Sequence, residues 1–175
     1  MKKIGMLLCL TLLLSGCFQS MGGSEQQYNE KYENFMELLI DNSKQISTNI
    51  PFDWDFQMEQ TEEGYTYTVK ISNPRVAMSN VQMIGANLEE INETQVAPSI
   101  GIFEDTVYNM IPNQVNVEKG YYEGMGISGI SSEKAFVLNC LVVYKDKNQT
   151  DNYVYFIINA NYDDFVGEEV VDDNE

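Results

Sequence analysis

The sequence predicts a mostly β protein, an antiparallel immunoglobulin-like β-sandwich of about seven strands with one N-terminal α-helix. Three observations lead to this fold class. Short runs in which apolar and polar residues alternate recur along the chain, and segments rich in Asn, Gly, Pro and Asp separate them. No helical segment stands between successive runs, as it would in a βαβ fold. One segment with helical periodicity precedes all of them.

A helix is predicted within the segment 24–47, from about residue 25 to residue 44. Ser24, with Gln27 three residues later, has the arrangement of a capping box, in which each side chain bonds a free backbone amide of the first turn. Apolar residues follow at helical spacing, with Glu and Lys between them: Tyr28, Tyr32, Phe35, Met36 and Leu39. We expect this apolar stripe to pack against the rest of the domain.

The next segment predicts a β-hairpin, which opens the sandwich domain assigned to residues 48–162. Its first strand alternates apolar residues with acids and amides, and the alternation places Trp54 on the buried face. A turn at Thr61-Glu62-Glu63-Gly64 leads into a returning strand that Asn73-Pro74 ends. The apolar face of the first strand consists of Phe52, Trp54, Phe56 and Met58, and that of the second consists of Tyr65, Tyr67, Val69 and Ile71.

Five further short strands bring the predicted total to seven. The last two are apolar on both faces, which is typical of strands that are central in a sheet or covered on the outside. We therefore expect the helix to cover an outer face of the sandwich. The five predicted strands span residues 81–88, 99–104, 121–128, 135–144 and 153–160.

The first 16 residues have the composition of an export signal. Lys2 and Lys3 precede an apolar run of about 11 residues, 4–14. About 20 apolar residues are needed to cross a bilayer as a helix, so the run is too short for a permanent span. We expect residues 1–16 to be a signal peptide that is removed from the mature protein.

The end of this segment, Leu14-Ser15-Gly16-Cys17, resembles the lipobox of bacterial lipoproteins. The resemblance implies cleavage before Cys17 and attachment of lipid, including fatty acids such as palmitate, to its thiol. Two or more chains hold a protein stably on a membrane, so the implied location is the extracytoplasmic face of the cell membrane, with residues 17–23 as a tether. The alternative is an ordinary signal peptide with an incidental cysteine. Nine Lys against one Arg, with abundant Asn, Ile and Tyr, favour an AT-rich, Gram-positive source.

Charge and composition exclude several function classes. Loss of residues 1–16 would remove Lys2 and Lys3 and change the formal net charge from −17 to −19, which opposes binding to nucleic acid or to anionic lipid. The chain has no histidine, so it lacks the usual general base and the usual partner of a nucleophilic Ser or Cys. Cys140 would be the only thiol left in the folded domain, and its apolar surroundings in the sequence predict that it is buried.

From residue 65 to residue 160 the chain resembles the small immunoglobulin-like domains that follow the lipobox in uncharacterised Gram-positive lipoproteins. The resemblance is carried by the opening run Tyr-x-Tyr-x-Val-x-Ile-Ser-Asn from Tyr65 and by Val-Val-Tyr-Lys-Asp at the end of a late strand. It implies no catalytic residues and no cofactor. The Cys and Trp core pattern of antibody domains is missing, since Trp54 stands alone and Cys140 has no partner.

Acidic residues are abundant but form no recognisable catalytic or metal motif, and we predict no metal site. Four acidic pairs are the candidates for calcium or for a pair of catalytic carboxylates, and none has the spacing of an EF-hand loop. The segment 163–175 is strongly acidic with few bulky residues and is predicted to be a disordered tail. The pairs are Asp53 and Asp55, Glu62 and Glu63, Glu104 and Asp105, and Asp163 and Asp164.

A surface for a protein partner is predicted in the segment 108–125. It combines glycines with aromatic residues and Met, which protein interfaces favour, and the predicted contact residues are Tyr108, Tyr122 and Met125. The sequence thus favours a membrane-anchored envelope lipoprotein without enzymatic activity, acting as a binding or structural module for an envelope protein. A carboxylate-based extracytoplasmic hydrolase and a calcium-dependent adhesin are the alternatives.

Overall fold

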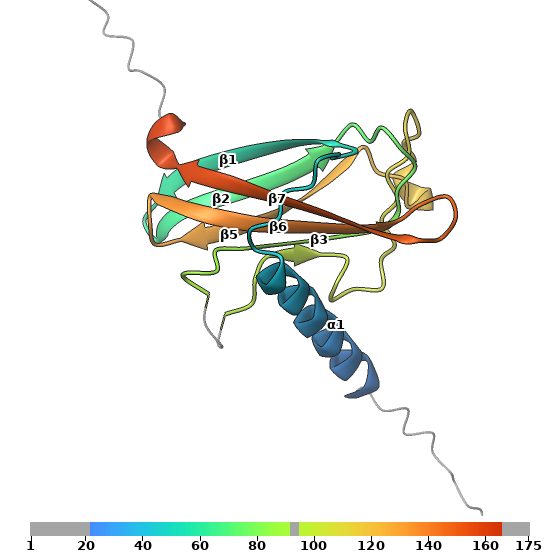
Figure 1. Cartoon of the computed structure of the whole chain (residues 1–175), viewed down its shortest axis with the longest axis horizontal. Helices are drawn as coiled ribbons and strands as arrows, with labels where there is room; N and C mark the ends of the chain where they lie inside the picture. The colour runs from blue at the N-terminus through green and yellow to red at the C-terminus, as the bar shows by residue number, and fades with distance from the viewer. Residues whose placement is uncertain (1–21, 92–94, 166–175) are drawn as a thin grey trace, which may run out of the picture.

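A computed structural model of the chain describes residues 22–91 and 95–165. The predicted signal segment, Cys17 and residues 166–175 of the predicted tail lie outside the described residues. The described part is mostly β, with seven strands in two antiparallel sheets and one N-terminal helix, which confirms the predicted sandwich (Figure 1). No helix in these two ranges is both long enough and apolar enough to cross a membrane.

The elements follow the order of the prediction. The helix α1 spans Gly22–Asp41 and precedes the strands. The strands are β1 (Asp53–Thr61), β2 (Gly64–Ser72), β3 (Ser79–Ala86), β4 (Ser99–Ile100), β5 (Gly124–Ser131), β6 (Ala135–Lys145) and β7 (Asp151–Asn161). Two short 3-10 helices, η1 (Val117–Lys119) and η2 (Tyr162–Asp164), lie before β5 and after β7.

Most strands lie within two residues of their predicted bounds, and two, β4 and β5, differ by three residues or more, each for a local reason. β4 has only two residues, because Gly101 adopts a positive φ of 75° and turns the chain away from β3. A Cβ at Gly101 would lie 2.9 Å from the carbonyl oxygen of Val81, so the close approach requires glycine. β5 begins at Gly124 instead of residue 121, because Tyr121 makes isolated bridges to Asn109 and Asn116.

The strands are arranged as in an immunoglobulin-like sandwich. One sheet has the order β1-β2-β5 and the other has the order β4-β3-β6-β7, with every neighbouring pair antiparallel. The short β4 pairs with β3, like the additional strand next to the third strand in variable immunoglobulin domains. β1 and β7 are edge strands, one in each sheet.

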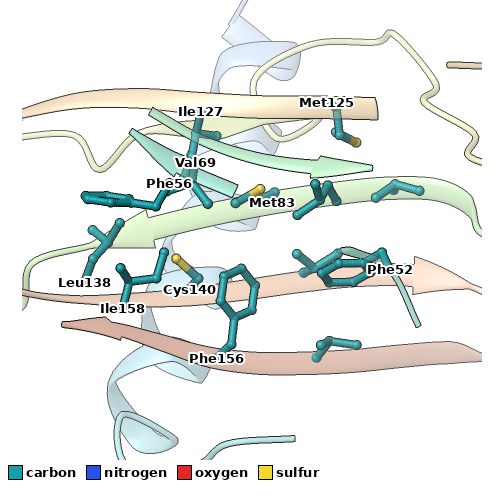
Figure 2. Packing of buried hydrophobic residues seen from close by; sticks show 14 of the residues in the cluster. Phe52, Phe56, Val69, Met83, Met125, Ile127, Leu138, Cys140, Phe156 and Ile158 are labelled. Atoms are coloured by element: carbon teal, nitrogen blue, oxygen red, sulfur yellow. The ribbon is translucent and has the colours of Figure 1, made fainter. Parts of the chain in front are cut away.

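The main hydrophobic core lies between the two sheets. Figure 2 shows side chains of both sheets meeting there, among them Ile127 from one sheet and Leu138 and Phe156 from the other. Cys140 lies in this core with 1% of its surface exposed, as predicted, and burial raises the pKa of its thiol. The thiol is therefore in the protonated, unreactive form.

A second core lies under α1, on the outer face of the larger sheet. Phe35 and Leu39 of the helix are buried against Leu141 and Val143 of β6 and Tyr155 of β7. β6 is therefore apolar on both faces because one face meets the other sheet and the opposite face meets the helix. This confirms that α1 covers an outer face.

Trp54 differs from its predicted environment. Phe52, Phe56 and Met58 are buried as predicted, but Trp54 on the same face of β1 is 42% exposed. β1 is an edge strand, so a large ring on its inner face can extend past the side of the sandwich. The Trp54 ring stacks on Phe156 of β7, with ring centroids 5.6 Å apart and an interplanar angle of 22°.

Candidate functional site

The predicted partner-binding segment 108–125 joins β4 to β5 and is held to the sandwich by backbone bonds. The amides of Met78 and Met110 each donate to the carbonyl oxygen of the other, at 2.9 and 2.8 Å. Tyr108 and Tyr122 contact one another, with ring centroids 5.0 Å apart, and both are half-buried. The Tyr108 hydroxyl donates to Glu104 at 2.9 Å, and burial together with this bond raises its pKa above the usual value.

Met125 does not lie on this surface. It is 6% exposed and points into the main core from β5, so the prediction that it contacts a partner is corrected (Figure 2). The most exposed apolar residues of the region are instead three valines: Val107 (51%), Val115 (62%) and Val117 (61%). The alternation of the β5 sequence, with Met125 and Ile127 facing one way, could have identified Met125 as a core residue.

Most of the acidic candidates bind neighbouring groups. Asp53 accepts hydrogen bonds from Arg75 and Asn73, which lower the pKa of its carboxyl group. Asp105 accepts from the Tyr28 hydroxyl at 2.8 Å, and Asp163 accepts from Lys134 at 2.7 Å. Across residues 22–91 and 95–165, no three His, Cys, Asp or Glu side chains are grouped so that they could hold a metal ion.

Glu90 is an acidic residue that the sequence did not single out. Its carboxylate accepts bonds from the hydroxyls of Ser131 and Ser132, at 2.8 and 2.6 Å, and from the side-chain amide of Asn87 at 2.9 Å. Burial alone would raise the Glu90 pKa, but these bonds outweigh it and the pKa is lowered. Glu90 therefore ties the segment after β3 to the end of β5, beside a surface hollow of about 570 Å³.

A second hollow lies between the two edge strands β1 and β7. We call it the edge groove; its volume is about 470 Å³, and it extends to the residues that follow β7. Its aromatic side chains include Trp54 and Phe165, each 42% exposed, and Phe165 contacts Phe56 at a centroid distance of 5.5 Å. The full lining is Trp54, Asp55, Phe56, Ile157, Ile158, Asn159, Asp164 and Phe165.

The edge groove was missed by the sequence analysis for two reasons. Trp54 was assigned to the buried face, and Phe165 lies in the segment 163–175 that was predicted to be disordered. The first residues of that segment instead form the end of η2, where the Asn161 side chain accepts a bond from the amide of Asp163. Phe165, a large apolar residue next to the acidic run, was the sequence feature that could have indicated that this part of the segment packs on the domain.

The edge groove is suited to binding through contact, hydrogen bonds and charge. Its lining combines aromatic rings and aliphatic side chains with one amide and two carboxylates. Aromatic rings with a few placed polar groups are typical of ligand-binding surfaces. Comparison of the chain with protein-family models, with curated proteins and with solved structures gives no match.

Proposed function

We propose that the protein is an exported lipoprotein, anchored through lipid on Cys17, whose β-sandwich is a non-catalytic binding or structural module of the cell envelope. The observation that carries the proposal is the position of α1. The helix begins at Gly22, five residues after Cys17, and is packed on the sandwich. A lipidated Cys17 would thus be joined to the folded domain by a very short segment.

Contacts along α1 fix the direction of the helix relative to the sandwich. The Tyr32 hydroxyl accepts a bond from the amide of Ala97 at 2.7 Å, and Lys31 donates to the carbonyl oxygen of Gly101 at 2.6 Å. The helix has 20 residues, which corresponds to about 30 Å at 1.5 Å per residue. In Figure 1 its N-terminal end points away from the sandwich. Because these contacts hold Lys31 and Tyr32 to the segments around β4, a lipid on Cys17 would lie beyond the end of α1 that points away from the sandwich.

Charge supports attachment through lipid instead of through the protein surface. The formal net charge is −17 for the full chain, and anionic lipid headgroups would repel a domain of this charge. The same charge favours a cationic partner. Tyr108 and Tyr122 remain predicted contact residues for an envelope protein, now together with the exposed valines Val115 and Val117.

The proposal is tested by replacing the thiol that would carry the lipid. In cells given a labelled fatty acid, the unmodified protein should carry label and sediment with membranes, and Cys17→Ser should lose both properties. Cys9→Ser is the matched control, because it removes a thiol from the same segment without changing Leu14-Ser15-Gly16-Cys17. Label that persists on Cys17→Ser, or a mature N-terminus at any other residue, would contradict the proposal.

A further inference from the structure

We propose that the edge groove binds an extended, cationic peptide segment, which adds as a strand to the free edge of β7. This inference rests on the proposed function, since it names the class of partner for the binding module. Three features of the groove carry it: an open strand edge, two exposed aromatic side chains and an uncompensated negative charge.

The segment before β1 is hydrogen-bonded to the outer edge of β7 at Tyr155, and the open edge begins after that residue. The amide of Ser47 donates to the carbonyl oxygen of Tyr155 at 2.8 Å, and the amide of Tyr155 donates to the Ser47 hydroxyl at 2.9 Å. The backbone groups of Tyr155 therefore point away from β6. Because they alternate in direction along an antiparallel strand, those of Ile157 and Asn159 point the same way. Among residues 22–91 and 95–165, no backbone group bonds them on that side.

An open edge of this kind is a template for strand addition. In that mode of recognition, backbone hydrogen bonds supply affinity, and pockets for alternate side chains supply specificity. Ile157 and Asn159 line the same groove as Trp54 and Phe165. A peptide strand bonded to β7 would therefore place alternate side chains against these rings.

The two exposed rings are held in place by buried ones. Trp54 is supported by Phe156, and Phe165 is supported by Phe56, and both supporting rings belong to the main core. Rings fixed in this way lose little conformational entropy when a ligand binds. Trp is the preferred aromatic partner for the ammonium group of Lys or the guanidinium group of Arg.

Charge selects a cationic occupant. Asp164 and Asp55 are the charged residues of the groove lining, Asp55 from the outer face of β1, and no Lys or Arg is among the lining residues. The nearby carboxylate of Asp53 is already paired with Arg75, whereas Asp55 accepts a hydrogen bond from the neutral side chain of Gln57. A Lys or Arg side chain between the rings could form a charge-assisted bond to Asp164, and the charge of Asp55 would add to the attraction. A second copy of this chain, with net charge −17, would be repelled.

Binding to the groove can be followed by tryptophan fluorescence, because Trp54 is the only tryptophan of the chain. The full chain, purified in a non-ionic detergent, is titrated with a capped heptapeptide of alternating Lys and Val while tryptophan fluorescence is recorded. We expect a saturable change that weakens as salt is added. The same peptide N-methylated on the residues that face β7 should bind about tenfold more weakly or worse, because it cannot donate to the strand edge.

Two charge variants separate specific binding from general attraction. Asp55→Asn with Asp164→Asn should weaken binding by about tenfold. The control, Glu118→Gln with Glu123→Gln, removes the same number of exposed charges from the segment before β5 and should leave binding nearly unchanged. Circular dichroism should confirm that both double variants are folded.

Several results would overturn the inference. Equal losses in the two double variants would mean that only net charge matters, and undiminished binding of the N-methylated peptide would exclude strand addition. Tighter binding of a Glu and Val peptide or of cellohexaose, or a concentration-dependent dimer that occupies the groove, would assign another occupant. Peptide binding does not require the lipid, so Cys17→Ser should bind the peptide with the same affinity as the unmodified protein, and the two proposals can fail separately. A failed titration with intact lipid labelling would refute the groove alone, and the reverse result would refute the anchor alone.

Discussion

Trp54 on β1 stacks on Phe156 of β7, and this contact joins the two sheets at their open side. The ring centroids are 5.6 Å apart, and each strand is the edge strand of its own sheet. Phe156 is 2% exposed, whereas Trp54 is 42% exposed. The pair therefore has one member in the core and one member in the edge groove.

This asymmetry predicts different costs for removing the two rings. Trp54→Ala should lower the free energy of unfolding by about 2 kcal/mol, because part of its surface is already in water, whereas Phe156→Ala should cost about 3 to 5 kcal/mol. Urea denaturation followed by circular dichroism measures both values. Equal costs for the two variants would show that Trp54 is as buried in solution as Phe156.

The same residue shows what sequence patterns can predict and what they cannot. Alternation identified the correct face of β1, because it reports which way a side chain points from a strand. It does not report whether the strand lies in the middle of a sheet or at its edge, since that depends on pairing with distant segments. The exposed position of Trp54 follows from that pairing.

Packing of α1 on the larger sheet can be tested with two adjacent residues. Both belong to α1: Leu39, on the face that packs on the sheet, is 1% exposed, and Ile40 is 53% exposed. Leu39→Ala should lower the free energy of unfolding by about 2 to 5 kcal/mol, whereas Ile40→Ala should change it by less than about 0.5 kcal/mol. Chemical denaturation gives both numbers, and comparable effects would mean that the helix does not pack on β6 as described.

Glu90 predicts a dependence of stability on pH. Its carboxyl pKa is lowered in the folded protein, where Ser131, Ser132 and Asn87 donate to the carboxylate. Its contribution is therefore fully present above the unfolded pKa, near 4.5, and is lost as the pH falls through the folded pKa. Glu90→Gln should be less stable than the unmodified protein at pH 7 by about 1 kcal/mol.

Thermal melting at a series of pH values measures the Glu90 contribution. The difference in stability between the unmodified protein and Glu90→Gln should shrink as the pH is lowered below about 4.5, because protonation then removes the charge that the donors stabilise. Other carboxyl groups with lowered pKa values, such as Asp53 and Asp146, are present in both proteins and cancel in the comparison. A difference that stays constant with pH would contradict the assigned role.

The candidate sites were harder to predict than the fold, because they depend on contacts between segments far apart in the sequence. Local alternation predicted the seven strands, and the apolar faces of 135–144 predicted the cover supplied by α1. The Glu90 cluster joins residues about 40 positions apart, and the edge groove joins residues about 100 positions apart. A sequence pattern within one segment cannot predict which distant residues that segment will contact.

The segment 108–125 allows core and surface residues to be distinguished directly. Met125 is 6% exposed in the main core, and Val117 is 61% exposed on η1. Met125→Ala should lower the free energy of unfolding by about 2 to 5 kcal/mol, because it leaves a cavity between the sheets. Val117→Ala should change stability by less than about 0.5 kcal/mol, because water already surrounds much of the side chain.

If an envelope protein binds this surface, Val117→Ala should weaken that binding without changing the melting temperature, as measured by capture on the immobilised full chain. A large loss of stability in Val117→Ala would place the valine in the core instead, and a stable Met125→Ala would mean that β5 does not present this residue to the opposite sheet.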